Sequence, residues 1–379
     1  MALLEVDDLH IRLQTQRGPA DAVRGISFAL ERGQTLGIVG ESGCGKSITV
    51  QSLMGLLPDT ARVSGRIRFD GQDLVGLSDA AMCRIRGHRI GMIFQEPMTA
   101  LNPLHTIARQ VAEPLRLHRG LPAAAARQEA LALLERVGIP DAATRLDAYP
   151  HQFSGGQRQR IGIAMALACG PDLLIADEPT TALDVTVQKQ ILDLIAELVA
   201  ERGMALILIS HDLGVIANTV ERMLVMYGGS VVESGPTAAL FAHRAHPYTQ
   251  GLFAARPVLG APRGGRLATI RGSVPELVDL PPGCPFAGRC DFTIDACRTT
   301  RPPAVELPHD HRVRCLRLDA VAAAQGQPAL TPPPPPPSRR PPRARTPGPC
   351  SRSPTSCATT RCRASRCSDR CRWCGRSMA

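Results

Sequence analysis

The stretch Gly40-Glu41-Ser42-Gly43-Cys44-Gly45-Lys46-Ser47 decides the fold of this chain. It matches the pattern Gly-x4-Gly-Lys-Ser/Thr, in which a glycine-rich turn joins a strand to a helix. Its flanks fit, because residues 35–39 form an apolar run and residues 47–57 carry apolar side chains at helical spacing. Glycines let backbone N–H groups converge on an anion, and the helix N-terminus adds positive partial charge. The stretch therefore predicts a phosphate-binding loop, with Lys46 on nucleotide phosphates and Ser47 on Mg²⁺. A glycine-rich turn without a ligand is the alternative.

Length and composition allow two or three domains and exclude several classes of protein. The chain has 379 residues, 44% of them hydrophobic, against roughly 100–200 residues for one domain. No window of about 18 apolar residues predicts a membrane span. The first residues, 1–12, lack the basic start and apolar run of a secretory signal. We therefore expect a cytoplasmic location.

The net charge of +10 lies in the C-terminal tail. From Val321 onward there are eleven arginines and one acid, Asp369, so residues 1–320 are close to neutral. A neutral body argues against nucleic-acid binding by the folded part. The tail is rich in proline and poor in aliphatic residues, which predicts disorder. It resembles coding sequence read in a shifted frame or a non-functional extension; an arginine-rich arm for nucleic acid or anionic lipid is the alternative.

Apolar runs and helical patterns alternate along residues 1–240. Between residue 97 and about residue 170 the pattern is mainly helical, with helices expected at 123–134 and 161–168. A further helix is expected at 187–200. This alternation predicts an α/β core with a largely parallel sheet. The expected strands are residues 4–13, 26–30, 35–39, 65–71, 90–94, 173–178, 205–209, 222–226 and 230–233.

Two acids, Asp177 and Glu178, end the apolar run that starts at Leu173. Asp177 is expected to hold Mg²⁺, and Glu178 to polarise a water molecule for in-line attack on the γ-phosphate. A solvated strand end would carry the same acids, but the phosphate loop earlier in the chain favours a nucleotide site. Gln95 and His211 lie at the ends of other expected strands. Gln95 could contact Mg²⁺ or water there, and His211 could contact the γ-phosphate. The alternative for His211 is a structural histidine whose hydrogen bonds are made within the protein.

The segment Ser154-Gly155-Gly156-Gln157 precedes a helix and predicts a second backbone site for an anion. One nucleotide has little use for two such sites in a monomer. In a head-to-tail dimer, however, each phosphate loop could be closed by the partner's copy of this segment. Asp184, shortly after the two acids, belongs to the same expected site.

In their order and spacing these motifs resemble the ATP-binding subunit of an ATP-binding cassette (ABC) transporter. The matching segments are Walker A (40–47), the Q-loop (Gln95), the signature (153–157), Walker B (173–178), the D-loop (181–184) and the switch histidine (His211). The resemblance covers about residues 3–240. It implies an α/β P-loop NTPase with a RecA-like core, an antiparallel β subdomain and a helical subdomain at about 97–165. Two departures are Phe153, where most members have Leu, and aliphatic Ile11 and Leu13 where an adenine-stacking aromatic is expected.

Further segments resemble the ATPases of dipeptide and oligopeptide importers: residues 94–103, 225–227, 246–249 and 283–290, with Cys297 and Cys315. This resemblance implies an ATPase at the cytoplasmic face of the inner membrane, with a second ABC ATPase subunit that is related rather than identical. Two membrane permease subunits, and indirectly an extracytoplasmic solute-binding protein, are the other implied partners, with no nucleic acid. A soluble ABC ATPase acting on nucleic acid or ribosomes, and a regulatory module that binds nucleotide, remain rival hypotheses. Dipeptides, longer peptides, nickel chelates and glutathione remain open as solutes.

Four cysteines, Cys284, Cys290, Cys297 and Cys315, crowd into the part of the chain after the cassette. A cytoplasmic chain is not expected to pair them as disulfides. Four thiolates suit a [4Fe–4S] cluster or tetrahedral zinc. The gaps are wider than the usual zinc pairs, and the subfamily resemblance also favours the cluster; zinc and unligated thiols remain alternatives. We therefore expect a cassette at 1–240, a cysteine-rich C-terminal extension at 241–320 and a tail at 321–379.

Overall fold

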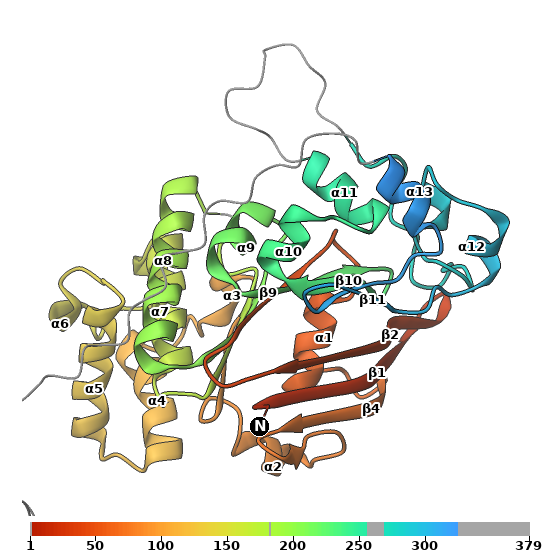
Figure 1. Ribbon diagram of the computed structural model, residues 1–379. Coiled ribbons are helices and arrows are strands. Elements are labelled where there is room, and N and C mark those ends of the chain that lie inside the picture. The colour runs from red at the N-terminus through yellow and green to blue at the C-terminus, as the bar shows by residue number, and fades with distance from the viewer. Residues whose placement is uncertain (1, 182, 256–268, 325–379) are drawn as a thin grey trace, which may run out of the picture. The chain divides into compact units, whose positions relative to one another are not determined.

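A computed structural model describes residues 2–181, 183–255 and 269–324 of the chain (Figure 1). All of them belong to one unit, Met1–Pro336; a second unit, Pro337–Ala379, lies outside the described residues. The predicted disorder of the tail from residue 325 onward also falls outside these ranges.

The central sheet has eight strands in the order β11-β12-β10-β9-β3-β8-β7-β6. Its five strands from β9 to β6 are parallel to one another. Their residues are almost all buried and apolar, as expected of a parallel sheet covered on both faces. The predicted α/β core is therefore confirmed. These strands are β3 (Thr35–Val39), β6 (Ile90–Ile93), β7 (Leu173–Asp177), β8 (Ala205–Ile209) and β9 (Arg222–Tyr227).

A second sheet is antiparallel and has the strand order β2-β1-β4-β5. Leu4, Val6, Leu9 and Ile11 of β1 are buried and pack in one hydrophobic cluster with residues of α1 (Lys46–Leu53) and β3. The sheet thus covers the side of the core on which α1 lies, the helix that follows the phosphate loop. Its strands are β1 (Leu4–Thr15), β2 (Gly18–Leu30), β4 (Arg62–Phe69) and β5 (Gln72–Asp73), followed by α2 (Asp79–Cys83).

The helical part follows β6. Ile107, Val111 and Leu115 form the buried face of α4, and this face packs in one cluster with Leu134 of α5 and Ile163 of α7. Figure 1 shows α4 to α8 grouped on one side and the β1–β2–β4 sheet on the other. The helices are α3 (Pro97–Ala100), α4 (Ile107–Arg119), α5 (Ala123–Arg136), α6 (Ala142–Arg145), the 3-10 turn η1 (Pro150–Gln152), α7 (Gly155–Leu167) and α8 (Val185–Arg202).

The segment after the cassette continues the central sheet. β12 pairs with β10, where Val313 lies opposite Glu233. Buried Glu233 accepts hydrogen bonds from the N–H groups of Ala245 and His246, and its Oε1 lies 2.8 Å from Nε2 of His311. Glu233 precedes the predicted boundary at 240, and its carboxylate is thus satisfied by residues that follow this boundary. The elements are α9 (Leu213–Thr219), β10 (Ser230–Pro236), α10 (Thr237–Ala242), α11 (Pro247–Ala254), the 3-10 turn η2 (Ala287–Arg289), α12 (Asp295–Thr299), β11 (Val305–Leu307), β12 (His311–Val313) and α13 (Leu318–Ala323).

The predicted start of the tail at residue 321 needs a correction. It falls inside α13, and the side chain of Val321 is only 1% exposed. The composition of the tail hid this short helix, because its alanines and single valine carry little periodic signal. The folded part therefore extends at least to Ala324.

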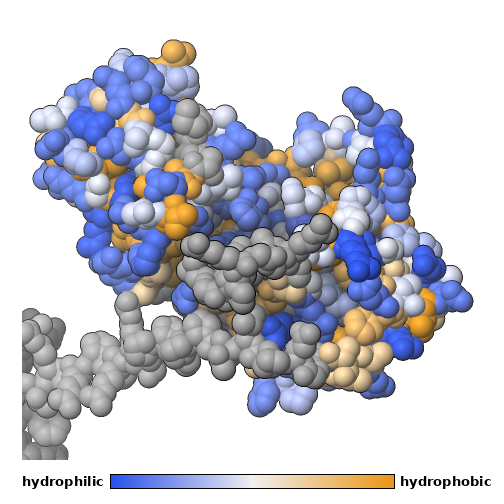
Figure 2. All heavy atoms as spheres, turned by 90° about the horizontal axis from the view of Figure 1, so that it is seen from above, coloured by the Kyte–Doolittle hydropathy of each residue, from blue (hydrophilic) through white to orange (hydrophobic). Residues whose placement is uncertain are grey.

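Among the described residues, few large apolar side chains are exposed. On the face drawn in Figure 2, hydrophilic residues predominate and hydrophobic ones form small separate groups. None of the helices in the described ranges combines the length and the apolar character needed to cross a membrane.

Candidate nucleotide-binding site

The phosphate loop, residues 40–47, joins β3 to α1 as predicted. Gly40, Gly43 and Gly45 all have positive φ, at 155°, 80° and 99°. A Cβ on Gly40 would lie 2.3 Å from the carbonyl oxygen of Met226, and one on Gly45 would lie 2.6 Å from that of Ala22. Glycine is required at these two positions by both the backbone angles and the close approach of neighbouring strands.

Lys46 and Ser47 begin α1 and reach two different groups. The Lys46 ammonium, 5% exposed, donates to the carbonyl oxygens of Gly40 (2.8 Å) and Glu41 (3.1 Å). The Ser47 hydroxyl donates to Asp177 Oδ1 at 3.0 Å. Burial raises the pKa of Asp177 above its ordinary value. A hydroxyl and a carboxylate this close are a donor set that suits a hard cation.

Glu178 is the centre of the polar network at this edge of the sheet. Its Oε2 accepts hydrogen bonds from Gln95 Nε2 (3.3 Å) and Thr181 Oγ1 (3.1 Å), and lies 3.3 Å from Nδ1 of His211. Its Oε1 lies 3.9 Å from the Lys46 ammonium. The structure thus brings together four predicted residues from four segments of the chain. Thr181 belongs to the predicted D-loop (181–184), but its contact with Glu178 was not predicted. Its position three residues after Glu178, in the turn that follows β7, is the signal that could have found this contact.

The backbone of Glu178 is in the left-handed region, with φ of 44°. A residue with a Cβ rarely adopts this conformation, and functional sites are where such strain is found. The N–H of Glu178 donates to the carbonyl of Ile209 at the end of β8 (3.1 Å), which holds the strained residue in place. The side chain of Glu178 is 14% exposed, against 68% for His211. The network can therefore orient a carboxylate that accepts a proton from water.

The segment 154–157 forms the start of α7. Ser154 and Gln157 make a capping box: the Ser154 N–H donates to Gln157 Oε1 at 3.1 Å, and the Gln157 N–H donates to Ser154 Oγ at 3.4 Å. A Cβ on Gly156 would lie 2.8 Å from Val187 of α8, so glycine lets the two helices pack closely. Within the described ranges, no hydrogen bond joins this segment to residues 40–47 of the same chain.

Asp184 caps α8 by accepting from the Val187 N–H at 3.0 Å. Its own carboxylate is exposed, and the next side chain, Val185, is 83% exposed. Ala182, in the same turn, lies outside the described residues. The described part of the chain thus does not bring Asp184 to the phosphate loop.

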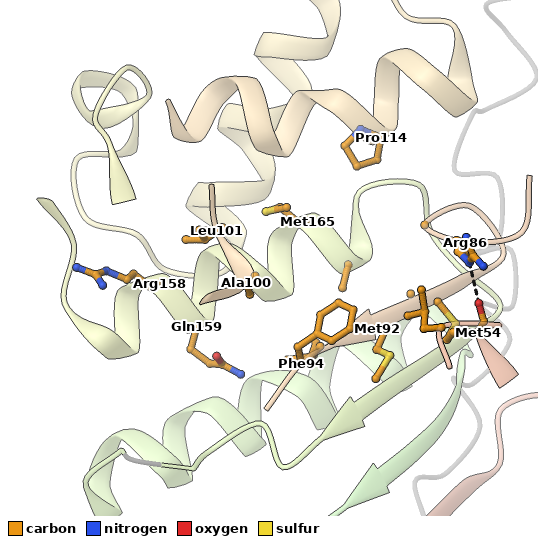
Figure 3. A pocket seen from close by; sticks show the side chains of 16 residues that line it. Met54, Arg86, Met92, Phe94, Ala100, Leu101, Pro114, Arg158, Gln159 and Met165 are labelled. Atoms are coloured by element: carbon orange, nitrogen blue, oxygen red, sulfur yellow. Dashed lines mark hydrogen bonds between the residues drawn. The ribbon is translucent and has the colours of Figure 1, made fainter. Parts of the chain in front are cut away.

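A pocket of about 280 Å³ opens between the helical part and the central sheet (Figure 3). Phe94, 44% exposed, lies one residue before Gln95 and faces this pocket together with Met92. Arg86 donates to the carbonyl of Met54 at 2.7 Å at one end. The sequence did not indicate this pocket, because its lining comes from five separate segments. The apolar lining includes Met54, Leu56, Met92, Phe94, Leu101, Pro114 and Met165.

A second, smaller pocket is lined by all four predicted cysteines, Cys284, Cys290, Cys297 and Cys315. All four are free thiols. Burial raises the pKa of Cys284 to about 11, and it also raises the pKa of Cys290 and Cys315. In the described part of the chain, no three His, Cys, Asp or Glu side chains are close enough together to hold a metal ion. The structure gathers the four thiols at one pocket without closing them around one ion.

Two family models match the chain. The model described as ABC transporter matches residues 23–181, which include the phosphate loop, Gln95, the 154–157 segment and the two acids. The model described as oligopeptide/dipeptide transporter, C-terminal region, matches residues 232–297. The second match covers three of the four cysteines and ends before β11 and β12.

Curated proteins are similar along most of the chain. The dipeptide transport ATP-binding protein DppD of Bacillus subtilis (strain 168) is 51% identical over 315 residues, which cover 83% of this chain and 94% of that protein. The oligopeptide transport ATP-binding protein OppD of Mycobacterium tuberculosis (strain ATCC 25618 / H37Rv) is 48% identical over 320 residues. These cover 84% of this chain but 52% of that longer protein.

Solved structures share the fold. A dimeric structure of the ATP-binding cassette MJ0796, in a post-hydrolysis state bound to ADP and Pi, has a TM-score of 0.56 at 28% identity. It covers 62% of this chain and 98% of that one. The protein cbiO1 of Clostridium perfringens, part of the ABC transporter complex cbiONQ, has a TM-score of 0.54 at 30% identity, covering 64% of this chain and 92% of that one.

Proposed function

Because this chain belongs to the ABC transporter family of ATP-binding proteins, we propose that it is the ATP-hydrolysing subunit of an importer for peptides or related small solutes. The observation that carries the proposal is the network in which Glu178 meets Lys46, Gln95 and His211 beside the Ser47–Asp177 pair. The hypothesis of a soluble ATPase acting on nucleic acid or ribosomes has no support from the similar proteins, whose names are those of peptide transporters.

ATP binding is assigned to the phosphate loop. Lys46 and the loop N–H groups bind the β- and γ-phosphates, and Ser47, Asp177 and Gln95 hold Mg²⁺. The hydrogen bond between Ser47 and Asp177 supports this assignment, because it puts two oxygen donors side by side. Mg²⁺ supplies positive charge that offsets the charge of the phosphates.

Hydrolysis is assigned to Glu178. Its carboxylate takes a proton from a water molecule, the water oxygen bonds to the γ-phosphorus, and the bond from that phosphorus to ADP breaks. Gln95 and Thr181 orient the carboxylate through their hydrogen bonds, and His211 contacts the γ-phosphate from its exposed position.

A second cassette completes the site in this proposal. The 154–157 segment and Asp184 would face the phosphate loop of a partner, which we take to be a related ATPase subunit. Two observations support a contact there: the segment makes no hydrogen bond to its own described phosphate loop, and Val185 beside Asp184 exposes 83% of its surface. The MJ0796 cassette, a similar protein, has a dimeric structure.

The pocket beside Phe94 would receive an apolar segment of a membrane permease subunit at the cytoplasmic face of the membrane. Its apolar lining and the exposure of Phe94 support a partner of that character. Gln95 directly follows Phe94 and donates a hydrogen bond to Glu178. An occupant that contacts Phe94 would therefore be connected to the hydrolytic carboxylate through Gln95. Solute would reach the permease from an extracytoplasmic binding protein, which this chain does not contact.

The four cysteines are proposed to hold a [4Fe–4S] cluster. Their common pocket supports this, as does the donor set of four thiols. Zinc would require the sulfurs to close around one ion at about 2.3 Å each, whereas a cluster binds each thiolate through a different iron and so spaces them more widely. Bound iron would contribute folding free energy to this segment.

The experiment that tests the proposed function is peptide uptake by vesicles that contain the chain and its membrane subunits. We expect uptake to require MgATP and to stop with Lys46→Ala, because the ammonium is the strongest phosphate contact in the loop. Comparing dipeptides, longer peptides, nickel chelates and glutathione as solutes would identify the transported class. Uptake that continues with Lys46→Ala would contradict the assignment.

A further inference from the structure

Glu41, the second residue of the phosphate loop, is held by two side chains from the segment that follows the cassette. The hydroxyl of Tyr248, on α11, accepts a hydrogen bond from the Glu41 N–H at 2.7 Å. The guanidinium of Arg289 makes a bidentate pair with the Glu41 carboxylate, at 2.6 and 3.2 Å. Tyr248 is fully buried and the Arg289 side chain is 7% exposed. Such a pair is stronger and more directional than a single hydrogen bond.

One peptide plane connects these contacts to Lys46. The carbonyl oxygen of Gly40 and the N–H of Glu41 belong to the same planar peptide group. The carbonyl accepts from the Lys46 ammonium at 2.8 Å, while the N–H donates to Tyr248 on the opposite side. Gly40, at φ of 155°, has the backbone freedom to let this plane rotate. The Tyr248 hydroxyl opposes that rotation and so keeps the carbonyl facing Lys46.

The two holding residues are themselves fixed. Arg289 also donates to the carbonyl oxygens of Arg271 (2.8 Å) and Gly272 (3.1 Å) and to the Tyr227 hydroxyl (3.3 Å). The Tyr227 ring packs edge-to-face on Tyr248, with centroids 4.6 Å apart. Because Arg289 makes these further hydrogen bonds and the Tyr248 ring packs on Tyr227, neither side chain can leave Glu41 without breaking further contacts.

This aromatic group also borders the cysteine pocket. Phe286, between Cys284 and Cys290, packs on Tyr227 with ring centroids 5.1 Å apart and on Tyr248 with centroids 5.4 Å apart. Arg289 itself directly precedes Cys290 in the chain.

We propose that Tyr248 and Arg289 are positioning residues for the phosphate loop: they hold Glu41 so that Lys46 faces the nucleotide phosphates. The proposal rests on the proposed function, in which ATP binds at residues 40–47. Because the contacts act on the loop and do not reach the water from which Glu178 takes a proton, their loss raises the KM for ATP while kcat at saturating ATP is kept. The segment after the cassette is thereby part of the ATP site.

The test measures the KM and kcat of ATP hydrolysis in the assembled complex, together with MgATP binding by the full chain. Tyr248→Phe removes one hydroxyl and keeps the ring; we expect KM and Kd to rise about tenfold and kcat to stay within about twofold. Arg289→Ala is expected to raise KM and Kd in the same way. Arg289→Lys should partly restore them, because lysine keeps the charge but cannot make the bidentate pair. Arg312→Ala is the matched control, since Arg312 pairs with Glu306 on the surface of the same segment.

A double variant tests whether Arg289 acts through Glu41. Glu41→Gln keeps the shape of the side chain, so it serves where Arg289→Ala does not fold. If the two act as a pair, Arg289→Ala with Glu41→Gln raises KM no further than either single variant. Additive effects would overturn the proposal, as would wild-type KM and Kd in Tyr248→Phe and Arg289→Ala.

Lys46→Ala separates this proposal from the proposed function. If Lys46→Ala abolishes MgATP binding and Tyr248→Phe leaves it unchanged, the positioning role alone is wrong. If Lys46→Ala binds MgATP like the wild type, ATP does not bind at residues 40–47, and both proposals are overturned.

Discussion

The nucleotide site and the cysteine pocket are built by opposite means. Glu178, Ser210 and Gly40 follow the ends of the adjacent parallel strands β7, β8 and β3, whose residues are almost all buried. Of the four cysteines, Cys297 lies in the five-residue helix α12 and Cys290 directly follows the three-residue turn η2, while Cys284 and Cys315 lie outside helices and strands. A buried sheet fixes its strand ends without help from a ligand, whereas a segment with so little regular structure gains most from ligation. The comparison predicts that the nucleotide site stays folded when a ligand-binding side chain is replaced, and that the cysteine pocket does not.

The largest effect is expected at the nucleotide site, where a substitution should change the rate of ATP hydrolysis and not folding. Glu178→Gln keeps the shape of the side chain and removes the carboxylate charge that accepts a proton from water. We expect ATP hydrolysis to fall by about 10²–10⁴-fold, with MgATP binding and the unfolding temperature unchanged. Glu197→Gln, at an exposed position on α8, is the control. Near-normal hydrolysis by Glu178→Gln in the complex would remove Glu178 from its assigned role.

At the cysteine pocket the expected effect is on folding and not on kcat at the ATP site. In protein purified without oxygen, Cys290→Ser should reduce bound iron from about four atoms per chain to near zero. The described segment 269–324 should then be cut faster by protease. Cys83→Ser, at an exposed cysteine of α2, should change neither. Zinc in place of iron would change the metal but keep the site; four freely alkylated thiols with no metal would remove it.

The nucleotide site was largely predictable from sequence because its residues follow strands that read as apolar runs. Lys46, Ser47, Asp177 and Glu178 each lie within a local pattern, and parallel strands bring such patterns to one edge. Tyr248 and Arg289 lie in segments noted from sequence only for a family resemblance, 246–249 and 283–290. Their contacts with Glu41 were missed because these span 207 and 248 residues of the chain. The strands β11 and β12 have three residues each, too few for an alternation to be visible.

A pH effect distinguishes the two regions further. Burial lowers the pKa of His246 to about 4, from an ordinary value of 6.5. Its Nδ1 accepts a hydrogen bond from the Tyr248 N–H, which requires an unprotonated nitrogen. Above pH 6.5 both folded and unfolded states are neutral, so the contribution to stability is complete. As the pH falls from 6.5 to 4, only the unfolded state gains the proton, and on the order of 3 kcal/mol is lost.

His246→Asn keeps an acceptor for the helix cap and removes this titration. Urea unfolding at several pH values between 7 and 4 should therefore show a shallower loss of stability in the variant than in the wild type. His309→Asn is the control, because His309 is exposed and asparagine tolerates its positive φ of 65°. Equal slopes in His246→Asn and the wild type would show that another group causes the acid sensitivity.

The smallest effect concerns the end of the folded part. Ending the chain after Ala324 keeps α13 complete and should leave ATP hydrolysis and the unfolding temperature unchanged. Ending it after Ala320 removes buried Val321, at a cost of roughly 1.5–3 kcal/mol. Two truncations that differ by four residues thus locate the boundary. Loss of complex assembly in the chain that ends at Ala324 would instead give the arginine-rich tail a function.

The measurement closest to the central claim is ATP hydrolysis by the complex that the chain forms in membranes. The tagged chain is purified from membranes, the proteins bound to it are identified, and hydrolysis is measured with and without peptide-loaded solute-binding protein. The account predicts two permease subunits and a related ATPase in the complex, and faster hydrolysis when the loaded binding protein is present. A chain that instead purifies with RNA or ribosomes, and whose hydrolysis responds to these and not to peptide, would contradict it.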